Sequence, residues 1–177
     1  MSVLLAQFQH YRQQWPAEGD AGHFVEILAE GERVFHRHAL EGHFTGSAWL
    51  VSSDGERVLL THHRKLGRWL QLGGHADGDV DLARVALREA EEESGLDGLS
   101  VEAAPFDLDR HRIPTRGAEP EHWHYDVRYV VRAGANEQFQ VSEESHALAW
   151  RTIREIAEDP ASDASLRRMA SKWLQRS

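Results

Sequence analysis

The sequence predicts an α/β domain with an N-terminal helical extension. Apolar residues follow a helical period in residues 2–15 and 80–94, whereas short segments rich in β-branched and aromatic residues recur from residue 43 onward. The 177 residues, 41% hydrophobic and 28% charged, are enough for one domain with a substantial core. We expect residues 1–40 to form a helical extension packed on the core, and residues 41–177 to form the main domain.

The N-terminal extension is predicted to contain two short helices. Apolar residues with helical spacing occur on both sides of a break at residues 16–22. The first set is Leu4, Leu5, Phe8 and Tyr11, and the second is Phe24, Val25, Ile27 and Leu28.

A hairpin is predicted next. The apolar run that includes Phe44, Leu50 and Val51 leads to a turn with the pair Asp54-Gly55, and a second run covers residues 58–60. Residues 69–72 read as a short strand, after which Gly73-Gly74 is expected to break the chain before a polar loop.

The helix predicted over residues 80–94 is the best-marked element. Leu82, Val85 and Ala86 form its apolar side, Asp79 or Asp81 can cap its start, and Gly95 suits a left-handed C-terminal residue. Beyond it we expect strands at residues 99–103, 106–113, 122–131 and 147–150, a loop at 114–121 and a final helix at about 162–175.

Composition narrows the classes of function. The net charge of −9 argues against a nucleic-acid polymer as partner, and an anionic substrate would then need a bridging cation. The absence of cysteine excludes disulfides, thiolate ligands and cysteine nucleophiles, and it suits a reducing compartment. No stretch approaches the roughly 18 apolar residues of a membrane span, so we expect a cytoplasmic protein with no membrane partner.

Three carboxylates mark the candidate site. Glu89, Glu92 and Glu93 have the spacing i, i+3 and i+4, which places them on one face of the predicted helix. Like charges there repel unless a hard divalent cation such as Mg²⁺ neutralises them, although a solvated acidic face has the same spacing. Arg88, four residues before Glu92, can pair with one carboxylate and hold the group in place.

Residues 74–96 resemble the Nudix signature G-x5-E-x7-R-E-U-x-E-E-x-G-U, where U is a bulky apolar residue. Gly74, Arg88, Gly95, Leu96 and the three glutamates fall in register, and Ala90 occupies the first U position. The first Glu of the signature is replaced by Val80, which cannot bind metal through its side chain. Asp79 or Asp81 could supply the missing carboxylate.

The resemblance implies an α/β/α sandwich with a mixed β-sheet and a hydrolase that cleaves a diphosphate linkage in a nucleoside diphosphate derivative or similar small molecule. It implies that Glu89, Glu92 and Glu93 bind Mg²⁺, with Mn²⁺ as an alternative, and that Arg88 orients them. The metal would polarise the diphosphate and help generate the attacking hydroxide. In the same family an additional carboxylate often acts as base, which points here to Glu143 or Glu144.

Further residues are candidates for contact with the substrate. His75 follows the glycine pair, and on a strand His122 and His124 share one face with Asp126, where they could bind a second metal or a phosphate, or simply face solvent. The cations Arg64 and Lys65 precede the signature and could meet substrate phosphates.

Two other classes of function are open alternatives: a Nudix-fold ligand sensor without catalysis, and an enzyme like isopentenyl-diphosphate isomerase. A sensor usually lacks the signature carboxylates, which are present here, and the isomerase's active-site cysteine has no counterpart in this chain. The sequence does not choose the diphosphate compound, the number of metal ions or the oligomeric state, although the N-terminal helices could build a homodimer.

Overall fold

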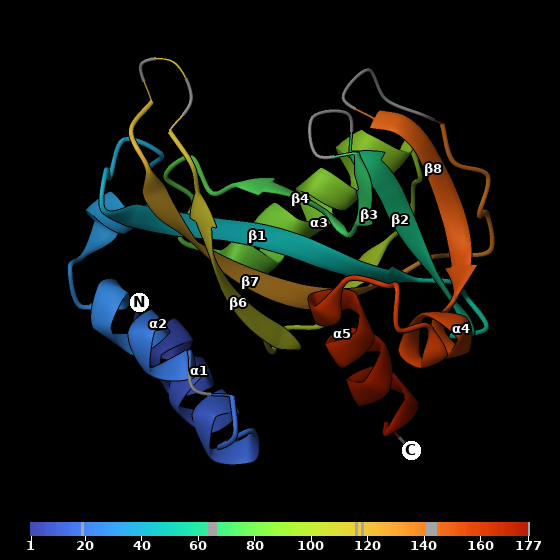
Figure 1. Cartoon of the computed structure of the whole chain (residues 1–177), viewed down its shortest axis with the longest axis horizontal. Coiled ribbons are helices and arrows are strands. Elements are labelled where there is room, and N and C mark those ends of the chain that lie inside the picture. The colour runs from blue at the N-terminus through green and yellow to red at the C-terminus, as the bar shows by residue number, and fades with distance from the viewer. Residues whose placement is uncertain (19, 64–66, 116, 118, 141–144, 177) are drawn as a thin grey trace.

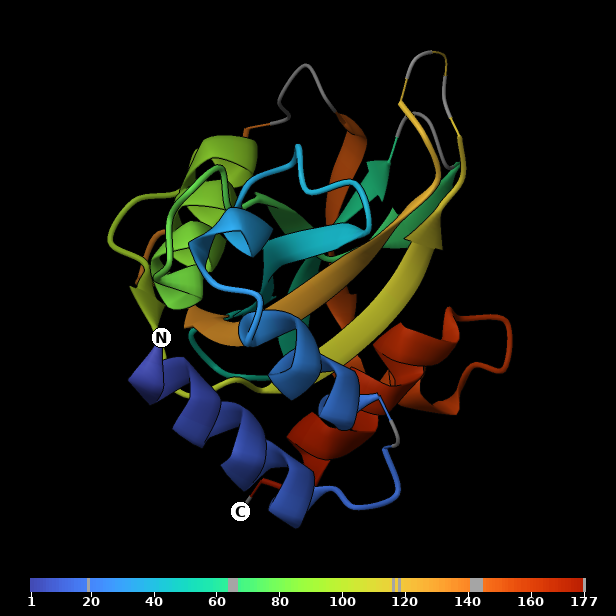
Figure 2. The same ribbon diagram turned by 90° about the vertical axis from the view of Figure 1, so that its left-hand side faces the viewer.

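The architecture is an α/β/α sandwich, as the resemblance implied. Helix α3 (Leu82–Ser94) covers one face of a mixed sheet, and helices α4 (Ile153–Glu158) and α5 (Ala164–Leu174) cover the other (Figures 1 and 2). Among the described residues, no helix is long and apolar enough to cross a bilayer. The structure is a computed structural model and describes residues 1–18, 20–63, 67–115, 117, 119–140 and 145–176.

The sheet is built around two long parallel strands, β1 (Gly42–Val51) and β7 (His122–Arg132). Strand β1 also pairs antiparallel with β2 (Arg57–His63) and β4 (Leu72–His75). Strand β7 pairs antiparallel with β5 (Ser100–Val101) and β6 (Asp107–Ile113). Strands β3 (Arg68–Leu70) and β8 (Ser145–Thr152) pair with β2. The predicted hairpin is therefore confirmed, with Val51 opposite Val58.

Side chains of β1 alternate between two hydrophobic layers. Ala48 and Leu50 pack with Ala90 of α3, whereas Trp49 and Val51 pack in the layer under α4 and α5 that contains Met169. Because alternate residues of a strand face opposite sides and both sides are covered, β1 is buried throughout.

The N-terminal segment shares a hydrophobic core with the rest of the chain. It contains α1 (Ser2–Gln14), α2 (Ala21–Leu28) and a 3-10 helix η1 (Glu32–Phe35), so the two predicted helices are confirmed. Phe8 and Phe24 pack in the same cluster as Phe44 of β1 and Val85 of α3. In Figure 2, α1 and α2 lie below the sheet, and Lys172 of α5 donates a hydrogen bond to Tyr11 of α1.

The prediction that Gly73-Gly74 breaks the chain is wrong, because both residues belong to β4 and pair with Ser47 and Gly46 of β1. Glycine is needed for close approach. A Cβ at Gly73 would lie 2.2 Å from the Ser47 hydroxyl, and one at Gly74 would lie 2.4 Å from a carboxylate oxygen of Glu89. The single strand predicted over residues 69–72 is split, since β3 pairs with β2 and β4 with β1.

Candidate functional site

The carboxylates of α3 lie against strand β4. The backbone N–H of Gly73 donates to Glu93 Oε1 over 2.8 Å, and the Glu89 carboxylate occupies the space that a side chain at Gly74 would fill. Glu89 and Glu93 are half-buried, whereas Glu92, on the same side of the helix, is exposed. Glu89 and Glu93 therefore both lie against β4, and Gly74 leaves room for the Glu89 carboxylate.

Arg88 fixes one of these carboxylates. Its guanidinium donates to Glu89 Oε1 at 2.9 Å and to the backbone carbonyl of His75 at 3.2 Å. The hydrogen bond to Glu89 is also the main reason that the pKa of Arg88 lies above its ordinary value. The expected ion pair is thus present, and its acidic partner is Glu89.

The donor set of Glu89, Glu92 and Glu93 suits a hard divalent cation. Carboxylate oxygens are the ligands that Mg²⁺ takes in proteins, together with water and substrate phosphate oxygens. Because Gly74 has no Cβ, the Glu89 carboxylate can lie against β4. A glycine at this position therefore suits the arrangement of the carboxylates. The exposure of Glu92 leaves one side of these carboxylates open to solvent.

The loop that contains Val80 uses its acidic residues for structure. Asp79 accepts two hydrogen bonds from the Arg84 guanidinium, at 2.8 and 2.6 Å, and Asp81 caps α3 by accepting from the Arg84 backbone N–H at 3.2 Å. Val80 itself is 42% exposed. Both acidic residues therefore hold Arg84 of α3, and their replacement of the lost carboxylate stays a prediction.

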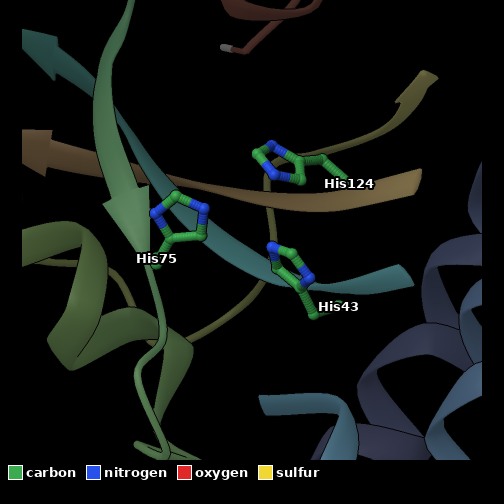
Figure 3. A group of neighbouring side chains, drawn as sticks. All are labelled: His43, His75 and His124. Atoms are coloured by element: carbon green, nitrogen blue, oxygen red, sulfur yellow. The ribbon is translucent and has the colours of Figure 1, made fainter. Parts of the chain in front are cut away.

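A cluster of imidazoles lies on the opposite side of β4 from Glu89. His43 of β1, His75 of β4 and His124 of β7 each offer one nitrogen, and these three atoms lie within 4.8 Å of one another. Figure 3 shows the three rings around a common space. The ring of His122 stacks on that of His43 at a centroid distance of 4.9 Å, and His111 lies 5.4 Å from His124.

The predicted common face of His122, His124 and Asp126 is confirmed, and it is not a solvated face. His122 is 5% exposed and Asp126 is 2% exposed. Asp126 accepts hydrogen bonds from the hydroxyls of Thr45 and Ser47, at 2.9 and 2.7 Å. This polar face continues on β1, because the two strands are parallel neighbours and Thr45 lies opposite Asp126.

Burial keeps the clustered imidazoles neutral. It is the main reason that the pKa of His43 is lowered to about 4, and burial together with the neighbouring histidines lowers the pKa of His124 to about 2. The pKa of His75 is also below its ordinary value, again chiefly because of burial.

Four predicted site residues lie outside the described residues. Arg64 and Lys65 fall between β2 and β3, and Glu143 and Glu144 immediately precede β8. Their contacts with substrate and their role as base stay predictions.

His43 is the clustered residue that sequence reasoning did not select. It stands directly opposite His124 in the parallel pairing of β1 with β7, although the two residues are far apart in the chain. The register of two parallel strands cannot be predicted from one sequence. The sequence offered one signal for His43, which is a histidine at the start of the first strand in a chain with 12 histidines.

Comparison with known proteins gives a consistent result for most of the chain. The sequence profile described as the NUDIX domain matches residues 43–173. A search among curated protein sequences gave no match.

Solved structures share the fold at low sequence identity. A Nudix-family hydrolase from Clostridium perfringens has 23% identity and a TM-score of 0.60, covering 75% of this chain and 95% of that one. The Escherichia coli dihydroneopterin triphosphate pyrophosphohydrolase has 17% identity and a TM-score of 0.59, covering 73% and 92%. The Nudix domain of Shewanella oneidensis NrtR, solved with ADP-ribose, has 20% identity and a TM-score of 0.52, covering 86% and 97%.

Proposed function

The chain belongs to the Nudix family and is a pyrophosphohydrolase at the level of that family, and we propose a more specific activity. The chain cleaves a diphosphate linkage in a nucleoside diphosphate derivative or similar small molecule, with Mg²⁺ as cofactor. Mn²⁺ is the alternative metal, since it too accepts carboxylate and water ligands. A cytoplasmic location and a possible homodimer stay predictions.

The observation that carries the proposal is the seating of the α3 carboxylates on β4. Glu93 accepts the Gly73 N–H, Glu89 lies at Gly74 and is held by Arg88, and Glu92 faces outward beside them. An acidic surface with no role in binding has no need of a glycine at position 74, which admits the Glu89 carboxylate to the strand. A sensor that had lost catalysis would have no need of the full carboxylate set.

Each residue has a proposed role. Glu89, Glu92 and Glu93 hold the cation, and Arg88 fixes Glu89 through their ion pair. When bound, Mg²⁺ neutralises charge that develops on the diphosphate and lowers the pKa of a water ligand. Glu143 or Glu144 is proposed as the base that takes a proton from the attacking water. Water then displaces one phosphate from the other.

Arg64 and Lys65 are proposed to meet substrate phosphates, and His75, His122 and His124 are proposed to lie near the substrate. The exposed or half-buried position of the α3 carboxylates supports a small, flexible ligand over a polymer, as does the net charge of −9.

A substrate screen tests this function. The first compounds are those suggested by structural neighbours: diadenosine tetraphosphate, from the Caenorhabditis elegans Ap4A hydrolase with a TM-score of 0.55, dihydroneopterin triphosphate and ADP-ribose. Products are identified by mass spectrometry with Mg²⁺ or Mn²⁺ present. We expect cleavage between phosphates. Tight binding of a compound without turnover would support the sensor instead.

A further inference from the structure

The histidine cluster of β1, β4 and β7, on the side of β4 opposite Glu89, has the features of a second metal site. We propose that His43, His75 and His124 bind a transition-metal ion of the Zn²⁺ type, separately from the carboxylates of α3. This inference does not depend on the proposed hydrolase activity, because it rests on nitrogen ligands that the carboxylate site does not use.

Buried ring nitrogens in the cluster lack hydrogen-bond partners among the described residues. His43 is 1% exposed, and its Nδ1 lies 3.4 Å from the carbonyl oxygen of Ala39, to which it can donate. That hydrogen bond places the lone pair on Nε2, which is buried and has no hydrogen-bond partner among the described residues. Nε2 of His124 is likewise buried without a hydrogen-bond partner among the described residues. A buried polar nitrogen without a partner is costly, and coordination to a metal ion would remove that cost.

The hydrogen bond from His43 to Ala39 also matches a general feature of metal-binding histidines. Such histidines usually donate their second ring N–H to a carbonyl or carboxylate, which fixes the ring and the tautomer. The lowered pKa values of His43, His75 and His124 support the same conclusion, since only a neutral imidazole can ligate a metal.

The geometry is close to that of a tetrahedral site. The three candidate nitrogens lie within 4.8 Å of one another, and nitrogens bound to tetrahedral Zn²⁺ lie about 3.4 Å apart. The nitrogens therefore need to approach one another by at most about 1.4 Å, which rotation about the side-chain bonds can supply. The strands that carry them are rigid, because β1 pairs with both β4 and β7.

Ligand chemistry decides which metal fits. Imidazole nitrogens suit Zn²⁺, Co²⁺, Ni²⁺ and Cu²⁺, whereas Mg²⁺ requires oxygen ligands. Three neutral ligands leave one tetrahedral position open and leave the charge of the ion uncompensated. An anionic oxygen, such as that of hydroxide or phosphate, is therefore the favoured fourth ligand. The backbone carbonyl of His75 also accepts a hydrogen bond from Arg88, which binds Glu89 on the other side of β4.

The test is calorimetric titration of the chelator-treated full chain with Zn²⁺ in the presence of millimolar Mg²⁺, which occupies the carboxylates and does not compete for imidazole. We expect one Zn²⁺ ion per chain. His43→Ala, His75→Asn and His124→Ala should each weaken binding at least about tenfold. The control is His10→Ala, which removes an exposed imidazole on α1. Unchanged Zn²⁺ affinity in all three variants would overturn the proposal, as would the absence of Zn²⁺ binding under Mg²⁺.

Two measurements keep the test decisive if a buried histidine variant fails to fold. His75 is half-buried, so His75→Asn disturbs packing least, and circular dichroism of each metal-free variant checks its fold. The unaltered chain loaded with Co²⁺ should show the visible absorption of a tetrahedral ion. A purely octahedral spectrum would contradict the site. None of these readouts uses hydrolysis, so failure here leaves the proposed function standing.

Discussion

The individual glutamates of α3 differ in their surroundings, and this difference makes their roles testable. Glu93 accepts a backbone N–H from β4, whereas Glu92 is exposed and Glu91, next to it, is also exposed. Replacement of carboxylate by amide keeps the shape and removes the charge that a cation needs.

We predict that Glu92→Gln and Glu93→Gln each lower kcat about a hundredfold or more, because both carboxylates stabilise the metal and thus the transition state. Glu91→Gln serves as the matched control and should retain full kcat. Steady-state kinetics on the substrate from the screen gives the answer. An effect on KM alone would contradict the assigned role.

Gly74 is a second residue whose role is specific. An added methyl group would lie 2.4 Å from Glu89 Oε2, which is the end of a flexible side chain, so we predict that Gly74→Ala displaces the carboxylate and lowers kcat, with little loss of stability. Gly22→Ala, where no atom lies within 4 Å, is the control and should keep kcat while stabilising α2 by about 0.5–1 kcal/mol. Normal kcat in Gly74→Ala would show that Glu89 is not needed in its present position.

At the scale of elements, α3 is defined by its ends. Asp81 accepts the Arg84 N–H at its start, and Gly95 ends it with a φ of 67°. We predict that Asp81→Ala lowers the free energy of unfolding by about 1 kcal/mol, because a cap is lost, and that Asp81→Asn retains most of the stability. Urea unfolding measures both. Equal losses in the two variants would mean that charge, not capping, is the contribution.

Elements with strong local signals could be predicted from the sequence. The capped, amphipathic helix α3 was identified with its bounds almost unchanged, since Asp81, the apolar positions and Gly95 all act locally. The glycines of β4 were misread as a break, because their function is close contact with Ser47 and Glu89, which only the fold brings near. Helix α4 was missed, since six residues are too few to show a helical period.

The same distinction holds for the candidate site. The three glutamates are close in sequence, so helical spacing alone predicted their common face. The histidine cluster joins β1, β4 and β7 through a parallel pairing, so His75 and His124 could be selected only as individual residues and His43 was not selected. Arg88 was predicted to bind a carboxylate, but its bond to the carbonyl of His75 needed the structure.

At the scale of the whole molecule, a buried ion network joins both termini to the sheet. Lys172 of α5 donates to Asp107 of β6 at 2.7 Å and to Glu18, beyond α1, at 2.9 Å. Arg168 binds both Asp107 and Asp109 of β6. Together with the aromatic core around Phe8 and Phe24, this network connects α1 and α2 with the sheet and α5. The division into an extension of residues 1–40 and a main domain stays a prediction.

From this network we predict how the free energy of unfolding depends on pH in acid. Burial alone would raise the pKa of Asp109, but the bonds and charges of His111, Arg128 and Arg168 outweigh it, so the folded pKa lies below the ordinary value. The unfolded chain then binds more protons in acid. The stabilisation is complete above about pH 4 and is lost as the pH falls through the folded pKa.

We predict that Asp109→Asn lowers the free energy of unfolding at pH 7 by about 2 kcal/mol, the usual cost of lost charged hydrogen bonds, and flattens its dependence on pH below 4. Urea unfolding at pH 7, 4 and 3 measures this, with the exposed Asp97→Asn as control. The same steep acid dependence in Asp109→Asn and in the unaltered chain would assign acid unfolding to other groups.

We propose that this Nudix chain hydrolyses a diphosphate linkage with a divalent cation held by Glu89, Glu92 and Glu93. The most direct measurement is the turnover of the chain on the substrate from the screen, after treatment with EDTA and again after Mg²⁺ is restored. We predict negligible turnover without metal and recovery with Mg²⁺ in the unaltered chain, and no recovery in Glu93→Gln. Undiminished turnover in metal-free protein, or full recovery in Glu93→Gln, would contradict the account.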